Sequence, residues 1–211
     1  AQKLLKNCSK IYIMPYSKFT LEEVLTKFNL TLVENLGKFN NLPDVAPSKL
    51  LEETLEDNIP LAVAIGTEKA RSELIVSPIL VAVRKHLNKQ ISLFSGIEFN
   101  VNIELGLSGF CDFIISLSSL QTIIKAPVVT LVEAKNDNIK SGFGQCLAEM
   151  VAAQIFNKNK GNQISQIYGA ITTGTAWQFL ELEGENVVLD LEEYSLKNLP
   201  KLLGVLISFV S

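Results

Sequence analysis

Histidine and cysteine are scarce in this sequence. Its 211 residues include a single histidine, His86, and three cysteines, Cys8, Cys111 and Cys146, which form no CxxC or Cys/His cluster. Zinc sites and Ser/His or Cys/His catalysis need histidine-rich or cysteine-rich groups, so these classes are excluded. Any catalytic metal is expected to be a hard ion held by carboxylates. An odd number of cysteines without a pairing pattern also predicts a reducing, cytoplasmic location.

Long hydrophobic runs are also missing. Apolar residues make up 47% of the chain and charged residues 19%, which favours a buried core over intrinsic disorder. The longest apolar stretch, Leu199–Val210, is interrupted by polar and helix-breaking residues and is shorter than the roughly 20 residues that span a bilayer. It predicts a packed helix or a homodimer contact, with no membrane partner. The length suits one domain with a small appendage, and the N-terminus shows no signal-peptide pattern.

Basic residues do not dominate, since 19 Lys and Arg stand against 22 Asp and Glu, for a formal charge of −3. Phosphate binding needs clustered basic side chains, so this balance alone disfavours a nucleic-acid partner. The distribution is more favourable, because residues 61–180 carry 10 basic and 8 acidic side chains, a local balance of +2. Residues 181–211 carry 2 basic and 6 acidic side chains. The charge therefore permits a nucleic-acid partner without requiring one.

Hydrophobic periodicity and turn residues predict alternating helices and strands. Helices are expected at residues 21–28, from 47 or 48 to about 57, and at 67–87, 141–157 and 192–209. Strands are expected at residues 91–104 with a turn near 95–96, and at 109–116, 127–135, 164–172, 175–181 and 186–189. Thr20 and Thr67 are expected as N-caps, and Pro78 is expected to kink or divide the third helix. The order predicts an α/β fold with a mixed β-sheet flanked by helices.

Two acidic residues and a lysine stand at the ends of otherwise apolar strands. Side chains alternate along a strand, so Glu133 and Lys135 in the run Leu131-Val-Glu-Ala-Lys135 project to the same face. Asp112 interrupts a second apolar run, Gly109–Ile115. Carboxylates buried here without partners would be costly, whereas a cation would compensate their charge. Because magnesium keeps several waters, one or two carboxylates suffice to hold it. The arrangement predicts a magnesium or manganese site beside Lys135.

The pattern Gly109-x-x-Asp112, followed twenty-one residues after the aspartate by Glu133-x-Lys135, resembles the PD-(D/E)XK superfamily of restriction-endonuclease-like nucleases. The resemblance covers roughly residues 66–182, and Cys111 stands where the family pattern has proline. It implies a restriction-endonuclease-like fold for residues 61–211. Residues 1–60 would form a helical or irregular extension packed on this core.

The resemblance also implies roles for residues on the neighbouring helices. Family order places an acidic metal ligand on the helix before the strands, at Glu73, and an inward-facing glutamine on the helix after the ExK strand, at Gln145. Glu149 lies one turn beyond Gln145 on the same face and is a further candidate. The implied metal ligands are Asp112, Glu133 and Glu73, and the implied catalytic residues are Lys135, Glu133, Asp112 and Gln145. Lys135 would position or help to deprotonate an attacking water and offset charge on the phosphate.

The resemblance thus implies a magnesium- or manganese-dependent nuclease that hydrolyses DNA phosphodiester bonds. A catalytically silent nuclease-fold module for binding or assembly is the alternative. The sequence leaves open DNA versus RNA and endo- versus exonuclease action. Trp177 is expected to pack in the core rather than to stack on a base.

Simpler interpretations of the individual residues also stay open. Glu133 and Lys135 would then form a surface ion pair at a solvated strand end, worth at most about 1 kcal/mol. Glu73 would be an ordinary exposed helical glutamate. Gln145 and Glu149 would belong to the polar side of an amphipathic helix.

Overall fold

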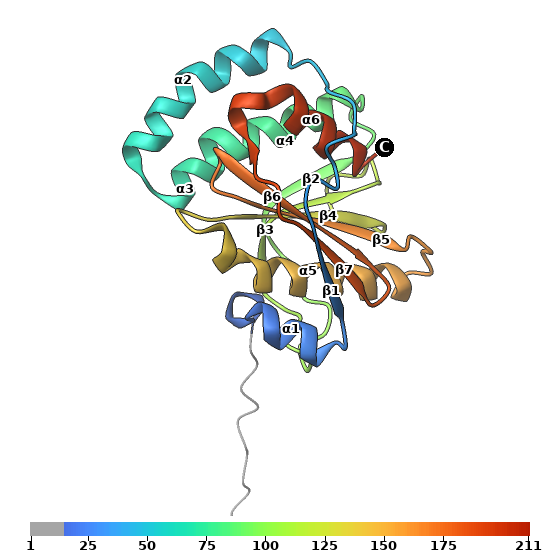
Figure 1. Ribbon diagram of the computed structural model, residues 1–211. Helices are drawn as coiled ribbons and strands as arrows, with labels where there is room; N and C mark the ends of the chain where they lie inside the picture. The colour runs from blue at the N-terminus through green and yellow to red at the C-terminus, as the bar shows by residue number, and fades with distance from the viewer. Residues whose placement is uncertain (1–14) are drawn as a thin grey trace, which may run out of the picture.

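One mixed β-sheet runs through the molecule, with helices on both of its faces (Figure 1). The computed structural model describes residues 15–211. Residues 1–14, which hold Cys8, the start of the predicted extension and the segment considered for a signal peptide, lie outside the described residues. The strands are β1 (Thr31–Asn35), β2 (Ser92–Glu98), β3 (Phe110–Ser116), β4 (Val128–Ala134), β5 (Gln166–Thr172), β6 (Ala176–Glu183), β7 (Asn186–Asp190) and β8 (Tyr194–Ser195). The predicted α/β architecture, a mixed sheet flanked by helices, is confirmed.

The sheet order is β1-β7-β6-β5-β4-β3-β2, and β8 pairs with β6. The pairs β1–β7 and β4–β5 are parallel, and the other neighbours are antiparallel. A parallel pair needs a crossover that returns the chain to the same end of the sheet. For β4 and β5 this crossover is α5 (Phe143–Asn159), so the end of β4 and the start of α5 lie close together.

Each face of the sheet is covered by a different set of helices. On one face α5 packs against β4 and β5, and α1 (Leu21–Lys27) packs on the outer side of α5 (Figure 1). The other face is covered by α2 (Lys49–Ile65), α3 (Glu68–Arg71), α4 (Ser77–His86) and α6 (Leu199–Ser208). Two hydrophobic cores result, one on each face.

The N-terminal helix begins as the sequence predicts. The Thr20 hydroxyl accepts the Glu23 N–H at 3.3 Å, and the Glu23 carboxylate accepts the Thr20 N–H at 2.8 Å, which together make a capping box. The strand after it was not predicted. β1 pairs in parallel with β7 at the edge of the sheet, so part of residues 1–60 belongs to the sheet itself. Most of β1 is exposed, so its sequence lacks the apolar alternation by which strands are predicted.

The second helix is longer than predicted. α2 begins close to the expected start at residue 47 or 48, after the N-cap Ser48, but continues past residue 57 through Pro60 to Ile65. Gly66, with a φ of +68°, caps its C-terminus. Pro60 removes one backbone donor from an exposed part of the helix. Leu55 and Ala62, on either side of the proline, are buried and hold both halves of α2 against the core.

Pro78 interrupts the third helix as expected, and the interruption takes the form of a π-helical turn. Thr67 caps α3 through its hydroxyl, and the chain then forms the π-turn Ser72–Val76 before entering α4. Proline has no N–H for the carbonyl four residues earlier. That carbonyl, at Leu74, instead accepts the side-chain N–H of Asn58 in α2 at 2.9 Å. The carbonyl that Pro78 leaves without its helical partner therefore links α2 to the π-turn before α4.

The predicted turn near Ser95 and Gly96 is wrong. β2 continues through both residues in register with β3, because Gly96 adopts a φ of +58° that a residue with a side chain rarely tolerates. A Cβ at Gly96 would meet nothing within 4 Å, so the space beside it is open. The chain instead reverses between Asn102 and Leu107, where the Leu107 N–H donates to the Asn102 carbonyl at 2.8 Å.

The C-terminal helix starts later than the predicted residue 192. Tyr194 pairs with Trp177 in β6, and its hydroxyl donates to Asp190 Oδ2 at 2.9 Å. These contacts hold residues 194–195 as a strand, and α6 begins at Leu199, directly before a proline that favours a helix start.

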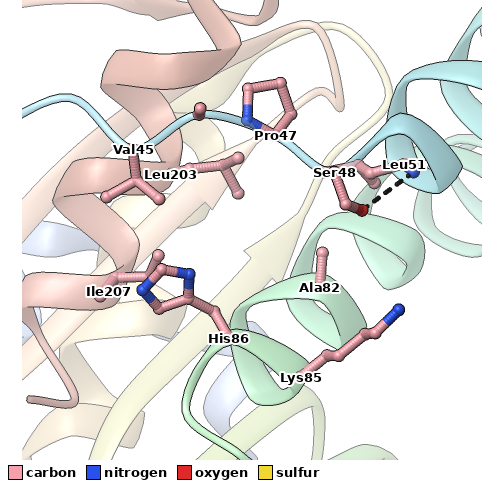
Figure 2. Close-up of a pocket in the computed structure, with 10 residues that line it drawn as sticks. Val45, Pro47, Ser48, Leu51, Ala82, Lys85, His86, Leu203 and Ile207 are labelled. Carbon is pink, nitrogen blue, oxygen red and sulfur yellow. Dashed lines mark hydrogen bonds between the residues drawn. The ribbon is translucent and has the colours of Figure 1, made fainter.

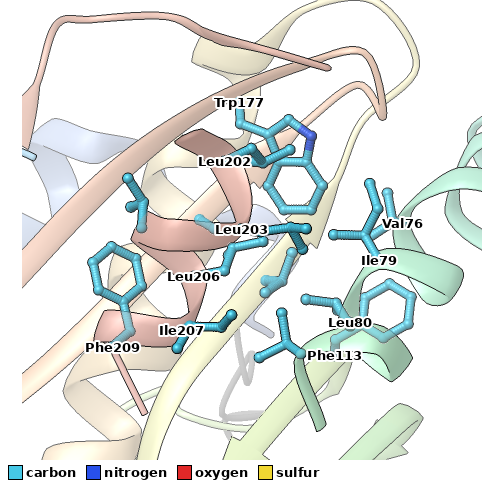
Figure 3. Close-up of a cluster of buried hydrophobic side chains, with 14 of the residues drawn as sticks. Val76, Ile79, Leu80, Phe113, Trp177, Leu202, Leu203, Leu206, Ile207 and Phe209 are labelled. Carbon is cyan, nitrogen blue, oxygen red and sulfur yellow. The ribbon is translucent and has the colours of Figure 1, made fainter. Parts of the chain in front are cut away.

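The apolar side chains of α6 are buried in the protein's own core (Figure 3). Leu202, Leu203 and Leu206 lie among side chains of α4, β3 and β6. Trp177 is also fully buried and donates its indole N–H to the Gly174 carbonyl at 3.1 Å, so its predicted packing role is confirmed. A homodimer would therefore have to form through a surface other than this helix face. No helix within residues 15–211 is long and apolar enough to cross a membrane.

The packing of α1 on α5 depends on Gly144. A Cβ there would lie 2.2 Å from the Phe19 carbonyl oxygen and 2.7 Å from the Leu21 nitrogen, and backbone atoms cannot easily move aside. Gly144→Ala should therefore lower the free energy of unfolding by about 1 to 3 kcal/mol, despite the better helix propensity of alanine. Urea denaturation followed by circular dichroism measures this change. Asn159→Ala, exposed on the same helix, should stay within about 0.5 kcal/mol of wild type. Equal stability of Gly144→Ala and wild type would contradict this packing.

Candidate functional site

The site forms where β4 ends. All seven residues of β4 are buried, and the Lys135 N–H that follows donates to the Thr172 carbonyl of β5 at 2.7 Å. Leu131 packs in the core on the α5 side, and alternation turns Glu133 and Lys135 to the same side. Glu133 is only 2% exposed, so a solvated strand end does not describe it. The structure brings this acid and lysine together at the end of a buried strand.

Asp112 reaches the same place from β3. The register between β3 and β4 ends at the pair Phe113–Val132, and Asp112 stands just beyond it. Its Oδ2 accepts the Ala134 N–H at 2.8 Å. The carboxylate thus accepts a β4 backbone N–H, as the backbone carbonyls of β3 do where the two strands are paired. Burial raises the pKa of Asp112, while the Ala134 N–H and Lys135 oppose that rise. Asp112 therefore lies where the two strands part, and its charge contributes to the raised pKa of Glu133.

Two side chains of α5 complete the group. Lys135 Nζ donates to Glu133 Oε1 at 2.5 Å and to Gln145 Oε1 at 3.3 Å. Gln145 Nε2 donates in turn to Glu149 Oε1 at 3.1 Å. A continuous chain of hydrogen bonds thus joins β4 to α5. Gln145 and Glu149 point inward, so they do not belong to a solvated polar side of the helix.

The close approach of α5 to Lys135 requires a glycine at position 142. A Cβ there would lie 2.7 Å from Ile171 Cγ2 and 3.2 Å from Lys135 Cε. The stem of Lys135 fills the space that a side chain at Gly142 would need. Its direction is therefore confined before any hydrogen bond is made.

Burial and charge act together on the two residues at the end of β4. Burial raises the pKa of Glu133 to about 8, the Asp112 carboxylate adds to this rise, and Lys135 opposes it. Burial alone would lower the pKa of Lys135, but the carboxylates of Glu133, Glu68 and Asp112 outweigh it and raise the pKa. Lys135 is therefore a charged ammonium at neutral pH.

Glu149 lies deeper than the other acids and is 0% exposed. Burial, followed by the nearby Glu133 charge, raises the pKa of Glu149 well above its usual range. The Cys111 thiol lies against Glu149, and burial raises the pKa of this thiol as well. A buried thiol of raised pKa is a poor nucleophile, so Cys111 has a packing role.

Glu73 stands apart from this group. Together with Asp112 it lines a cavity of about 220 Å³, but its carboxylate is 60% exposed and pairs with Lys69 at 2.8 Å. Glu68 lines the same cavity and acts on both Glu133 and Lys135, whose pKa values it raises. Glu68 and Glu73 both line the cavity beside Asp112, and Glu68 alone of the two contributes to the raised pKa values of Glu133 and Lys135.

Sequence reasoning missed Glu68 for a physical reason. Family order indicates only that an acid lies on the helix before the strands, and both Glu68 and Glu73 satisfy it. The π-turn Ser72–Val76 inserts one residue into the helical repeat, so the direction of Glu73 does not follow from helical periodicity. Thr67 marks the first turn of α3 in the sequence because it caps this helix. Glu68 lies in that capped turn, whereas Glu73 lies in the π-turn that follows.

Asp112 and Glu133 are the carboxylates best placed to hold a cation. Over residues 15–211 no three His, Cys, Asp or Glu side chains are grouped so as to bind a metal by themselves. Magnesium needs fewer protein ligands, because it retains waters. Glu133 Oε2 is buried and has no hydrogen-bond partner within residues 15–211, so this oxygen is available as a ligand. An oxygen-only donor set fits magnesium or manganese rather than zinc.

A second cavity, of about 260 Å³, lies at the other end of α4 and has different chemistry (Figure 2). Val45, Leu203 and Ile207 give it apolar walls, and the His86 ring points toward them. Neither Asp112 nor any other carboxylate lines this cavity. The only histidine of the chain is thus separate from the carboxylate site.

The sequence was also compared with known proteins. No protein-family model matches it, and no curated protein matches it either. The geometry of the site and the residues Asp112, Glu133 and Lys135 are therefore the features that bear on function.

The buried Glu149 should make the stability of the metal-free protein depend on pH. Because its pKa is raised in the folded state, the folded protein keeps a proton that the unfolded chain loses above its ordinary pKa of 4.5. The free energy of unfolding should therefore fall as the pH rises above 4.5. Glu149→Gln removes this titration and keeps an acceptor for Gln145, so it should be roughly 1 to 3 kcal/mol more stable than wild type near pH 8 and about equal near pH 4.

Chemical denaturation in EDTA across this pH range measures the difference. Glu104→Gln, an exposed glutamate, serves as the control and should follow the wild-type curve. Parallel pH profiles for wild type and Glu149→Gln would contradict a raised pKa at this position.

Proposed function

We propose that this protein is a magnesium- or manganese-dependent phosphodiesterase of the PD-(D/E)XK, restriction-endonuclease-like type, and that it acts on DNA. One observation carries the proposal. Asp112 and Glu133, from two adjacent strands, lie beside Lys135 at the end of a buried strand, and one Glu133 oxygen has no hydrogen-bond partner among residues 15–211. Such a group costs folding energy unless a cation or substrate completes it.

Asp112 and Glu133 would hold the metal ion, with water as further ligands. When bound, the ion would polarise a phosphate oxygen and lower the pKa of a coordinated water. The sequence motif assigned the third acidic role to Glu73. The electrostatic coupling of Glu68 to Glu133 and Lys135 favours Glu68 in that place.

Lys135 would act as a fixed positive charge. The carboxylates around it raise its pKa, so it keeps its proton at neutral pH and donates hydrogen bonds rather than acting as a base. An ammonium held in a partly buried site stabilises negative charge that develops on a phosphate. Of the two roles expected from the sequence, water activation and charge stabilisation, the geometry favours the second.

The surroundings of the site agree with this assignment. α5 follows the ExK strand directly and directs Gln145 at Lys135, in the order that the family resemblance implies. A cavity lined by Ser95, Gly96 and Asp112 lies on the α3 side of the sheet and would admit a phosphate next to the Asp112 carboxylate. Residues 61–180, which contain the site, carry the net positive part of the chain.

A silent nuclease-fold module remains the second candidate. The observation in its favour is that Lys135 is already neutralised by Glu133 and that the whole chain is acidic. A module with no metal chemistry, however, gains nothing from buried carboxylate oxygens that lack partners. This argument favours the enzyme.

Cleavage assays test the proposal directly. End-labelled single-stranded, duplex and branched DNA should be cut in magnesium or manganese and left intact in EDTA. Asp112→Ala and Lys135→Ala should each lower the rate at least roughly 100-fold, because each removes a group that acts on the transition state. Glu68→Gln should lower the rate and Glu73→Gln should leave it nearly unchanged. A folded, pure protein that cuts none of these substrates would contradict the enzyme and support the module.

A further inference from the structure

The Gln145 amide lies between two side chains of opposite hydrogen-bonding character. Its oxygen accepts from Lys135 Nζ at 3.3 Å, and its nitrogen donates to Glu149 Oε1 at 3.1 Å. We propose that Glu149 is a positioning residue, which fixes the orientation of the Gln145 amide and thereby the direction of the Lys135 ammonium. The inference rests on the proposed function, in which Lys135 is the catalytic lysine.

The orientation of an amide is set by its partners, because its two ends are almost identical in shape. Turned over, the Gln145 amide would direct its NH₂ group at the Lys135 ammonium and its oxygen at Glu149. Lys135 has only donors and therefore selects the oxygen. Glu149 Oε1 selects the nitrogen from the other side, and it accepts this bond as a carboxylate or as an acid with its proton on Oε2.

Gln145 donates the hydrogen bond to Glu149 Oε1, and the Cys111 thiol is the other polar group that lies against this carboxyl. The side chain is 0% exposed, on a part of α5 where Leu147, Ala148 and Met150 are buried too. Glu149 Oε2 is buried and has no hydrogen-bond partner in the described part of the chain. A carboxyl group in such surroundings is unfavourable, and a side chain without charge would pack there at lower cost. The bond to Gln145 is the contact that gives this acid a function.

The consequence for Lys135 follows from its three N–H groups. One donates to Glu133 and one to Gln145, which leaves the third for a bound phosphate or water. Because Gly142 also confines the stem, the free N–H has one direction. Without Glu149 the amide is free to turn, Lys135 loses its second acceptor, and the ammonium shifts toward the carboxylates.

Proton exchange of the Lys135 ammonium reports this positioning without any substrate. In protein labelled with ¹⁵N-lysine, the Lys135 resonance is assigned by its absence in Lys135→Arg. Wild type should show a slowly exchanging ammonium. Glu149→Met should speed this exchange roughly tenfold or more, whereas Glu149→Gln, which keeps an acceptor oxygen, should restore the slow rate. Asn159→Met, exposed on the same helix, is the control and should exchange like wild type.

A second variant keeps the test decisive if Glu149→Met does not fold. Gln145→Leu removes the amide itself and should speed the exchange to a similar extent, and the Glu149→Gln, Gln145→Leu double variant should add nothing further. Unchanged exchange in Glu149→Met or in Gln145→Leu would overturn the proposal.

Kinetics on a cleaved DNA provide the second measurement. Glu149→Met should lower kcat roughly tenfold or more with KM within about threefold, and Glu149→Gln should recover most of the rate. The two measurements separate the two proposals. Slow exchange that depends on Glu149, in a protein that cuts no DNA, would overturn only the proposed function. Cleavage of DNA by a protein whose Lys135 exchange rate is unchanged in Glu149→Met would overturn only the positioning role.

Discussion

The ion pair between Glu133 and Lys135 at the buried end of β4 is the interaction on which the site depends. Glu133 is almost fully removed from water, which raises its pKa to about 8, so its ionised form needs a compensating partner within the protein. Lys135 supplies it, but lies on the same strand and cannot by itself fill both carboxylate oxygens. The neighbouring elements supply the other groups around this carboxylate. β3 contributes Asp112, α5 contributes Gln145, and Gly142, directly before α5, leaves room for the lysine stem.

This arrangement favours function over stability. Among residues 15–211, Glu133 and Glu149 each have one buried oxygen without a hydrogen bond, and burial raises the pKa of both. Both features lower the stability of the metal-free protein at neutral pH. Compensation comes from the two cores, which bury α5 on one face of the sheet and α6 on the other. A rigid, well-packed scaffold can retain acidic groups that are completed only when a ligand binds.

The sequence predicted the parts of the fold that have strong local patterns. β4 is a buried apolar strand, Thr20 and Thr67 are caps, and strand alternation alone put Glu133 and Lys135 on one face. The remaining errors occurred where tertiary contacts decide the outcome. β1 is an exposed edge strand without alternation, Gly96 lets β2 pass through a predicted turn, and pairing with β6 holds Tyr194 out of the last helix. The choice between Glu68 and Glu73 required the π-turn, which no helical periodicity reveals.

The central claim is that Asp112 and Glu133 together hold a divalent cation. Calorimetric titration with manganese tests it most directly. The account predicts micromolar binding that is abolished in both Asp112→Asn and Glu133→Gln and retained in Glu73→Gln. No binding to the wild-type protein, or binding that survives in Asp112→Asn and Glu133→Gln, would contradict it.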